Sequence, residues 1–248
     1  MELTKETTDI RLKRIQENLG YIRANLDKLD EPIIIEFTGT PKSGKTTLVT
    51  HLQDIFSRCG IPVDKKRETA EYNPIQDKTI EEYNLWMIME LMKNTSEDLA
   101  SKEPKIIIYD RGVLDRIPWI RTSVEDGSFP KEDVGAIEGL YATKFMQKYK
   151  PLTYGFFTSP EISILRKGKP GRLVNETTLG MFNRNFTKTE PFFKRMSKKF
   201  THINTDEYQG RLNDFVFDVV DTVTSDTREL IEEKVQRRKL AEGPTFDD

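Results

Sequence analysis

The chain has 248 residues, enough for one sizeable α/β domain with a large core. Its formal net charge is −2, so no overall field attracts nucleic acid or an acidic membrane surface. The single cysteine, Cys59, excludes an internal disulfide and favours a reducing compartment, and we therefore expect a cytoplasmic protein. No signal peptide and no membrane partner are expected, because no apolar run approaches the length of a membrane span.

A helix is predicted ahead of the first strand, over residues 5–29. Its apolar residues recur at three- and four-residue steps with charges between them, namely Ile10, Ile15, Leu19, Ile22, Leu26 and Leu29. Residues 1–30 are therefore interpreted as a helical extension of the main domain. We expect this helix to pack on the domain, and the alternative is a surface for a partner.

The next stretch has the order strand, glycine loop, helix. Ile33 to Phe37 is a short isoleucine-rich run that predicts a buried strand, and Thr46 to Cys59 predicts an amphipathic helix. Between them, Gly39–Thr46 reads GTPKSGKT and satisfies the pattern G-x-x-x-x-G-K-[ST] at every fixed position. This context favours a phosphate-binding loop over a chance match in an ordinary turn.

The chemistry of such a loop accounts for its residue types. The glycines let backbone N–H groups point at phosphate oxygens, and the following helix adds the positive end of its dipole. Lys45 should reach the β- and γ-phosphates, and the Thr46 hydroxyl should bind Mg²⁺. The expected donor is ATP, with GTP as the alternative. The predicted nucleotide-binding residues are Gly39, Thr40, Pro41, Lys42, Ser43, Gly44, Lys45, Thr46 and Thr47.

Strands and helices alternate along the rest of the chain. Strands are predicted at 63–68, 105–109, 152–158 and 200–204, and helices at 79–101, 131–149, 175–196 (interrupted at Pro191) and 212–240. A loop with a short helix is predicted over 111–121, and another short helix over 159–166. This order predicts a three-layer α/β/α fold with a five-stranded parallel sheet and extra helices at both ends of the chain. The domain spans 31–240, and residues 241–248 are expected to fray.

Charged residues follow two of the predicted strands, at the edge where ligands of parallel sheets bind. Asp110 can hold Mg²⁺, and its alternative role is a helix cap. Arg111 suits a bidentate grip on phosphate, and its alternative is a surface ion pair. Glu68 and Glu71 are the two candidates for a general base, unless they are solvated loop charges. Asp115 and Arg116 are weaker candidates for the same pocket.

A basic loop with two glycines follows the fourth predicted strand. A mobile loop of this kind can close over a triphosphate and stabilise charge on the transferred group. The alternative is an ordinary solvated loop. The predicted lid covers 166–173 and contains Arg166, Lys167, Lys169 and Arg172, and Arg184 and Lys188 on the next helix could join it.

These pieces together resemble the thymidylate kinase and deoxynucleoside kinase group of P-loop kinases. The resemblance rests on GTPKSGKTT, on Asp110-Arg111 after the strand IIIY, and on the basic stretch LRKGKPGR. It implies phosphate contacts for Arg111, Arg166 and Arg172, and a base at Glu68. The chain departs from the group at Thr38, where a glutamate is usual, so the resemblance does not identify the acceptor. Residues 109–115 also resemble kinase-like ATPases with a D-R-G-x-x-D signature.

Three functions are compatible with this pattern. The first is a Mg²⁺-dependent kinase that moves the γ-phosphoryl of ATP to a nucleoside, a nucleotide or a similar small acceptor. The second is an ATPase switch that binds a protein partner, and the third is a kinase acting on polynucleotide ends. Arg111 and the basic loop favour the first, and the charge balance argues against nucleic acid as a partner. A homodimer is compatible with the sequence.

Overall fold

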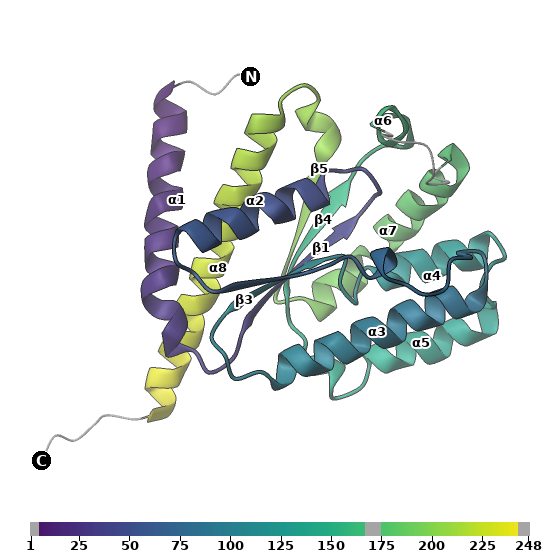
Figure 1. The fold of residues 1–248 in the computed structure, drawn as a ribbon, viewed down its shortest axis with the longest axis horizontal. Coiled ribbons are helices and arrows are strands. Elements are labelled where there is room, and N and C mark those ends of the chain that lie inside the picture. The colour runs from purple at the N-terminus through teal and green to yellow at the C-terminus, as the bar shows by residue number, and fades with distance from the viewer. Residues whose placement is uncertain (1–4, 167–174, 243–248) are drawn as a thin grey trace, which may run out of the picture.

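The computed structural model describes residues 5–166 and 175–242 and contains one parallel sheet of five strands. The strands are β1 (Ile33–Gly39), β2 (Val63–Lys66), β3 (Ile106–Asp110), β4 (Leu152–Phe157) and β5 (Lys199–Asn204). They lie in the order β2-β3-β1-β4-β5 (Figure 1). After β1 the chain forms β2 and β3 on one side of it and then crosses to form β4 and β5 on the other, so the order reverses at β1. Ligands of parallel sheets bind at the carboxyl end of such a strand.

Helices cover both faces of this sheet (Figure 1). They are α1 (Lys5–Asn25), α2 (Lys45–Arg58), α3 (Glu81–Ala100), α4 (Arg116–Glu125), α5 (Val134–Tyr141), α6 (Pro160–Leu165), α7 (Glu176–Met196) and α8 (Leu212–Glu242). One buried cluster joins the sheet to α1, α2 and α8, and a second joins it to α3, α4, α5 and α7. The predicted three-layer fold is confirmed. Among the helices of the described residues, none has the length and apolar character to cross a membrane.

The two-residue period of β1 decides which side chains reach which layer. Ile33, Ile35 and Phe37 belong to the cluster under α1, α2 and α8, whereas Ile34 belongs to the other. By the same alternation Glu36 points to the face of Ile34, and it is fully buried there. A charged residue type has thus been placed in the interior beside the end of β1.

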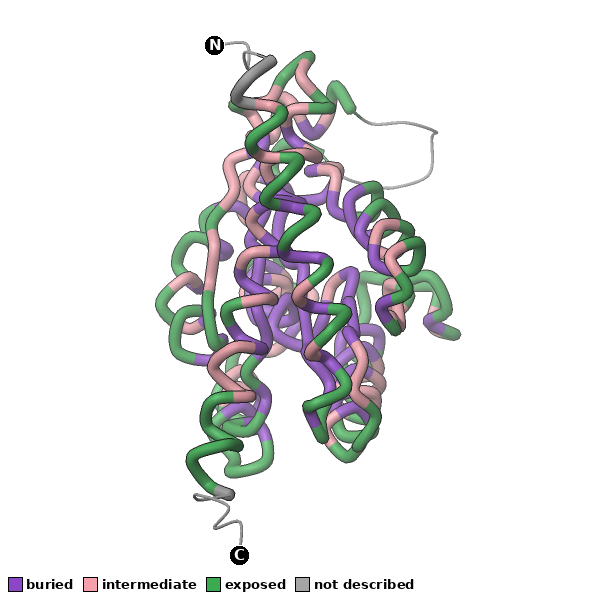
Figure 2. The backbone as a smooth tube through the Cα atoms, turned by 90° about the vertical axis from the view of Figure 1, so that its left-hand side faces the viewer, coloured by how far each residue is buried: buried purple, intermediate pink, exposed green. Residues whose placement is uncertain are grey.

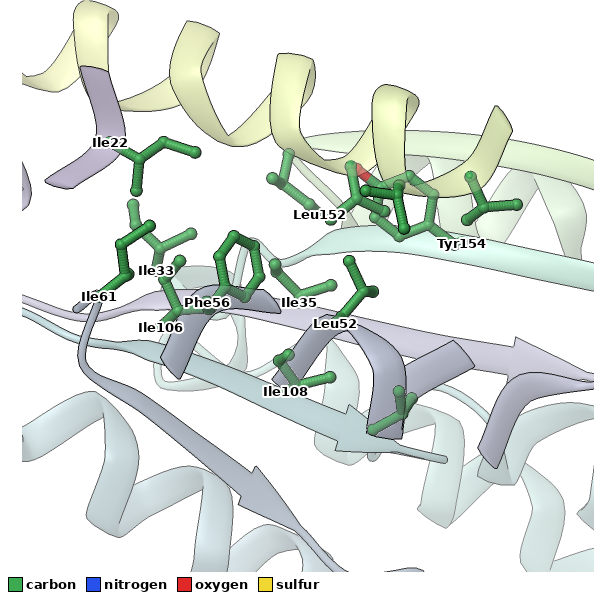
Figure 3. Close-up of a cluster of buried hydrophobic side chains, with 14 of the residues drawn as sticks. Ile22, Ile33, Ile35, Leu52, Phe56, Ile61, Ile106, Ile108, Leu152 and Tyr154 are labelled. Atoms are coloured by element: carbon green, nitrogen blue, oxygen red, sulfur yellow. The ribbon is translucent and has the colours of Figure 1, made fainter. Parts of the chain in front are cut away.

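Helix α1 packs on the domain, as the sequence predicts. It runs parallel to α8, because successive residues of α1 pair with successive residues of α8: Arg11 with Asp218, Arg14 with Asp221 and Asn18 with Ser225. Buried and exposed residues alternate along it (Figure 2). Its apolar side contributes Ile22, which is fully buried near Ile33 and Phe56 (Figure 3). The amino-terminal helix therefore completes the core.

Two predicted helices differ in detail from those observed. The predicted helix over 131–149 is broken into η3 (Lys131–Asp133), α5 and η4 (Met146–Lys148), and so this prediction was wrong in its length. The break follows Tyr141, where side chains take up the backbone carbonyls. The Thr143 hydroxyl donates to Leu140 O at 2.7 Å, and Gln147 Nε2 donates to Tyr141 O at 3.0 Å. Such bonds compete with the helical ladder.

The predicted interruption at Pro191 was also wrong, because α7 continues through it. Pro191 and Thr187, whose carbonyl loses its helical donor, both lie on the exposed side of the helix. Water can therefore take the place of the missing donor. Phe186 and Phe193, on either side of the proline, are fully buried and hold the helix to the core.

We expect Ile22→Ala to lower the free energy of unfolding by about 2–5 kcal/mol, because a fully buried side chain leaves a cavity between α1 and the sheet. Ile10→Ala is the matched control, since Ile10 lies on the same helix and is 62% exposed. We expect it to change stability by less than about 0.5 kcal/mol. Urea unfolding followed by circular dichroism measures both. Equal effects of the two substitutions would contradict the packing described for α1.

Candidate active site

The phosphate loop is fixed at its start by β4 and α7. At Gly39 the backbone has a φ of 123°, and a Cβ atom built there would lie 2.0 Å from Phe156 O, so no other residue fits. The Thr40 amide donates to Phe156 O at 2.9 Å, and the Thr40 hydroxyl donates to Asn183 Oδ1 at 2.8 Å. The loop is therefore anchored before any ligand binds.

Further along the loop the Ser43 amide donates to Thr40 O at 3.4 Å, but several other backbone N–H groups are unused within the described residues. The amides of Lys42 and of residues 44–47 have no acceptor within the parts of the chain that the structure describes. Lys42 and Gly44 have φ angles of 63° and 95°, and α2 begins directly after Gly44. Adjacent free amides at a helix start form a site for an anion. This arrangement is what the sequence pattern predicts for a phosphate-binding loop.

The Lys45 ammonium is folded onto the loop itself. Its Nζ lies 3.1 Å from Gly39 O, 2.6 Å from Thr40 O and 3.0 Å from Ser43 Oγ. Burial and the nearby Arg111 guanidinium, opposed by neighbouring carboxylates, together lower the pKa of this ammonium from 10.5 to about 7. A bound polyphosphate would supply the negative charge that Lys45 lacks and would stabilise its protonated form.

Asp110 ends β3 next to the start of the loop, since it lies opposite Phe37 of β1. Its carboxylate is buried, and its Oδ1 has no hydrogen-bond partner among the described residues. These residues contain no cluster of three or more side chains that could hold a metal by themselves. Mg²⁺ in nucleotide sites uses one or two protein ligands together with phosphates and water. The unpartnered oxygen of Asp110 and the hydroxyl of Thr46 fit that donor set.

Arg111 is held in a strained conformation between two carboxylates. Its φ is 68°, which is uncommon for a residue with a side chain. Its Nε lies 3.3 Å from Glu68 Oε1, its Nη1 donates to Asp115 Oδ2 at 2.7 Å, and the guanidinium lies over the ring of Trp119. Burial opposes the charge, but Asp115 and Glu68 outweigh it and raise the pKa of Arg111. Of the two candidate bases, Glu68 is thus part of this cluster, whereas Glu71 is exposed.

Asp115 connects the loop to Arg111. Its Oδ1 accepts from the Thr38 hydroxyl at 2.5 Å and from the Gly39 amide at 2.9 Å. Its Oδ2 accepts from Arg111 and, at 3.1 Å, from Trp119 Nε1. Burial would raise the pKa of Asp115, but the surrounding positive charges and the Thr38 hydrogen bond lower it overall. The carboxylate is therefore ionised, and it fixes Arg111 relative to the first glycine of the loop.

The Glu36 side chain forms hydrogen bonds that hold the segment around Asp115 in place. Its Oε2 accepts from the Tyr149 hydroxyl at 2.7 Å, and its Oε1 accepts from the Asp115 amide at 3.1 Å. Burial raises the pKa of Glu36 from 4.5 to about 8, so the carboxyl is mostly protonated at neutral pH. A Cβ atom on Gly112 would lie 2.4 Å from the Glu36 side chain, and this explains the glycine.

The basic residues of the predicted lid are only partly accounted for. Arg166 donates to the hydroxyl of Thr205 at 3.2 Å and to its carbonyl at 3.4 Å. Arg172 lies outside the described residues, as do Lys167 and Lys169. Arg184 pairs with Glu125 on the surface, so this structure does not bring it to the loop.

Sequence reasoning missed part of the site. It ranked Asp115 below Arg111, and it gave no role to Thr38, Glu36 or Tyr149. The spacing D-R-G-x-x-D contained a signal for Asp115, because the second aspartate lies one helical turn after the arginine. For Glu36 the signal was a lone acid within the apolar run IIIEF. No local pattern marked Tyr149, which meets Glu36 only through the fold.

Glu36→Gln should change how stability depends on pH. A carboxyl whose pKa is raised on folding stabilises the protein most below its ordinary value of 4.5, and this stabilisation is lost as pH rises to about 8. Glutamine does not titrate, so we expect the variant to gain on the order of 1 kcal/mol per pH unit over the wild type between about pH 5 and pH 8. Urea unfolding across this range measures the difference. Glu103→Gln, at an exposed position, is the control, and parallel curves for all three proteins would refute the assignment.

Comparison with known proteins bears on the fold. No protein-family model and no curated protein sequence matches the chain. Among solved structures, the deoxyadenosine kinase from M. mycoides with bound dATP is 17% identical, covers 70% of this chain and 91% of its own, and has a TM-score of 0.53. The same enzyme with bound dCTP is 18% identical, covers 73% and 100%, and has a TM-score of 0.51. The chain therefore shares its fold with these deoxyadenosine kinases.

Proposed function

We propose that the protein is a Mg²⁺-dependent phosphotransferase that moves the γ-phosphoryl group of ATP to a nucleoside, a nucleotide or a similar small acceptor. The observation that carries this proposal is the meeting of three features at one edge of the sheet. These features are a loop with unused amides, a buried carboxylate oxygen of Asp110 without a partner, and the ion pair of Arg111 with Glu68.

Each feature has a part in transfer. The loop amides and Lys45 would bind the triphosphate, while Asp110 and Thr46 would hold Mg²⁺, which neutralises charge on the phosphates. Arg111 would stabilise charge on the transferred group. Glu68, which contacts Arg111, would then take the proton of a hydroxyl acceptor. Arg166 and Arg172 are proposed to join from the lid.

An ATPase switch is the second candidate, because it would use the same loop and metal. The Arg111–Glu68 pair favours transfer, since hydrolysis needs no second group of charges to receive an acceptor. The deoxyadenosine kinases that share the fold are named for nucleoside phosphorylation, and this supports the same class of reaction. An acceptor panel with labelled ATP and Mg²⁺ separates the candidates, because label found only as free phosphate would indicate a switch.

We expect Lys45→Ala to reduce phosphoryl transfer by about 100-fold or more, because the ammonium would no longer balance charge on the β- and γ-phosphates. Lys13→Ala is the control, since Lys13 lies on α1 with its side chain 78% exposed. Steady-state kinetics and ATP binding measure both. Unchanged ATP affinity and unchanged turnover in Lys45→Ala would show that the loop assignment is wrong.

A separate experiment distinguishes Glu68 from Glu71 as the general base. With a hydroxyl acceptor, Glu68→Gln should lower kcat by about 100-fold while the KM for ATP changes little, because only the proton acceptor is lost. Glu71→Gln should leave kcat nearly unchanged, because Glu71 is exposed and lies outside the cluster around Arg111. The reverse order of effects would move the base to Glu71.

A further inference from the structure

Arg116 is a buried cation for which the described residues provide no hydrogen-bond acceptor. It is the first residue of α4 and follows Asp115 directly, and it is only 7% exposed. Within 5–166 and 175–242, its guanidinium makes no hydrogen bond or ion pair. A buried arginine normally has a carboxylate or several carbonyls around it, because an unpaired charge in the interior is costly.

The nearest carboxylate cannot fill this role. An ionised carboxylate offers about four lone-pair sites. Those of Asp115 are taken by four donors, namely Thr38, Gly39, Arg111 and Trp119. Among the residues that the structure describes, the five N–H groups of Arg116 therefore have no partner, although a negative charge lies next to it in the sequence.

The other cations of the site are satisfied. Lys45 has three acceptors in the loop, and Arg111 has both Glu68 and Asp115. Around Arg116, the ionisable groups are Asp115, Tyr83 of α3, Arg111 and Tyr141 of α5. Burial lowers the pKa of the Arg116 guanidinium, and Arg111 adds to this effect, whereas Asp115 raises the pKa but does not fully compensate.

The unpaired guanidinium is still accessible. No Arg116 nitrogen is among the fully enclosed side-chain atoms that lack a partner in the described part of the chain. It therefore keeps some contact with solvent, on the same segment that carries Arg111. The charge of Arg111 acts on Arg116, so the two guanidinium groups lie in the same region of the site.

We propose that Arg116 binds an oxyanion on the phosphoryl acceptor, so that the acceptor is a nucleoside monophosphate and not a neutral nucleoside. This inference rests on the proposed function and selects one class from its range of acceptors. A planar guanidinium matches the paired oxygens of a phosphate. Such a group would supply both the missing acceptors and the missing negative charge, whereas a neutral sugar hydroxyl would supply neither in full.

The test compares deoxynucleosides with their 5′-monophosphates as acceptors, in the full-length protein with Mg²⁺ and ATP. We expect the wild type to prefer the monophosphates. Arg116→Gln should raise the KM for a monophosphate about 10- to 100-fold, which corresponds to the loss of a charge-assisted hydrogen bond. The KM for ATP should not change, and Arg116→Lys should keep part of the affinity.

Arg121→Gln is the matched control, because Arg121 lies on the same helix but is paired with Glu138 and Thr189. It should leave acceptor affinity unchanged and should lower the free energy of unfolding. Arg116→Gln should not lower it, because the wild-type guanidinium has no partner to lose. A purely structural Arg116 would give the opposite pattern, with loss of stability and no change in acceptor affinity.

Calorimetric binding of the same compounds, with a non-hydrolysable ATP analogue present, gives a result that does not depend on turnover. Transfer to no acceptor would overturn the proposed function, while binding would still test Arg116. Equal affinity of wild type and Arg116→Gln for monophosphates would overturn the inference. Equal affinity of the wild type for nucleosides and monophosphates would do the same, even with kinase activity intact.

Discussion

The carboxylate of Asp115 is the interaction on which the site depends. It is 1% exposed and ionised, a state that is stable only when its oxygens are fully satisfied. The donors come from β1, from the first residue of the phosphate loop, from Arg111 and from α4. One buried charge thus fixes the loop and Arg111 at a set distance from each other, although they lie about 70 residues apart in the sequence. Its removal would leave an amide, a guanidinium and an indole without their acceptor.

A second layer holds Asp115 itself. Glu36 accepts from its backbone amide and from Tyr149, and Gly112 leaves room for the glutamate side chain. Because Glu36 is mostly protonated near neutral pH, it supports the segment without adding a second negative charge beside Asp115. Contacts of Arg111 itself hold its strained backbone conformation. Its amide donates to Phe37 O at 2.9 Å, and its side chain is paired with the carboxylates of Glu68 and Asp115.

The fold and the loop could be predicted from sequence because their signals are local. The alternation of apolar strands and amphipathic helices fixed the layers, and a pattern of eight consecutive residues marked the loop. The rest of the site depends on contacts that span the chain, such as Glu36 with Tyr149 at a separation of 113 residues, and no local pattern contains them. Pro191 failed as a helix breaker for a related reason, since the core contact of Phe193 outweighed a local preference.

The polar groups of this site that have no partner among the described residues have a common physical explanation. Among the described residues, backbone amides of the loop, one oxygen of Asp110 and the guanidinium of Arg116 lack partners, while the side chains of Asp115 and Arg111 are paired. Unpaired polar groups near the interior destabilise a protein, and they persist where a ligand supplies the missing partner. The amides require an anion, the Asp110 oxygen requires a cation, and Arg116 requires a second anion. Donor phosphates, Mg²⁺ and an anionic acceptor would meet these three requirements in turn.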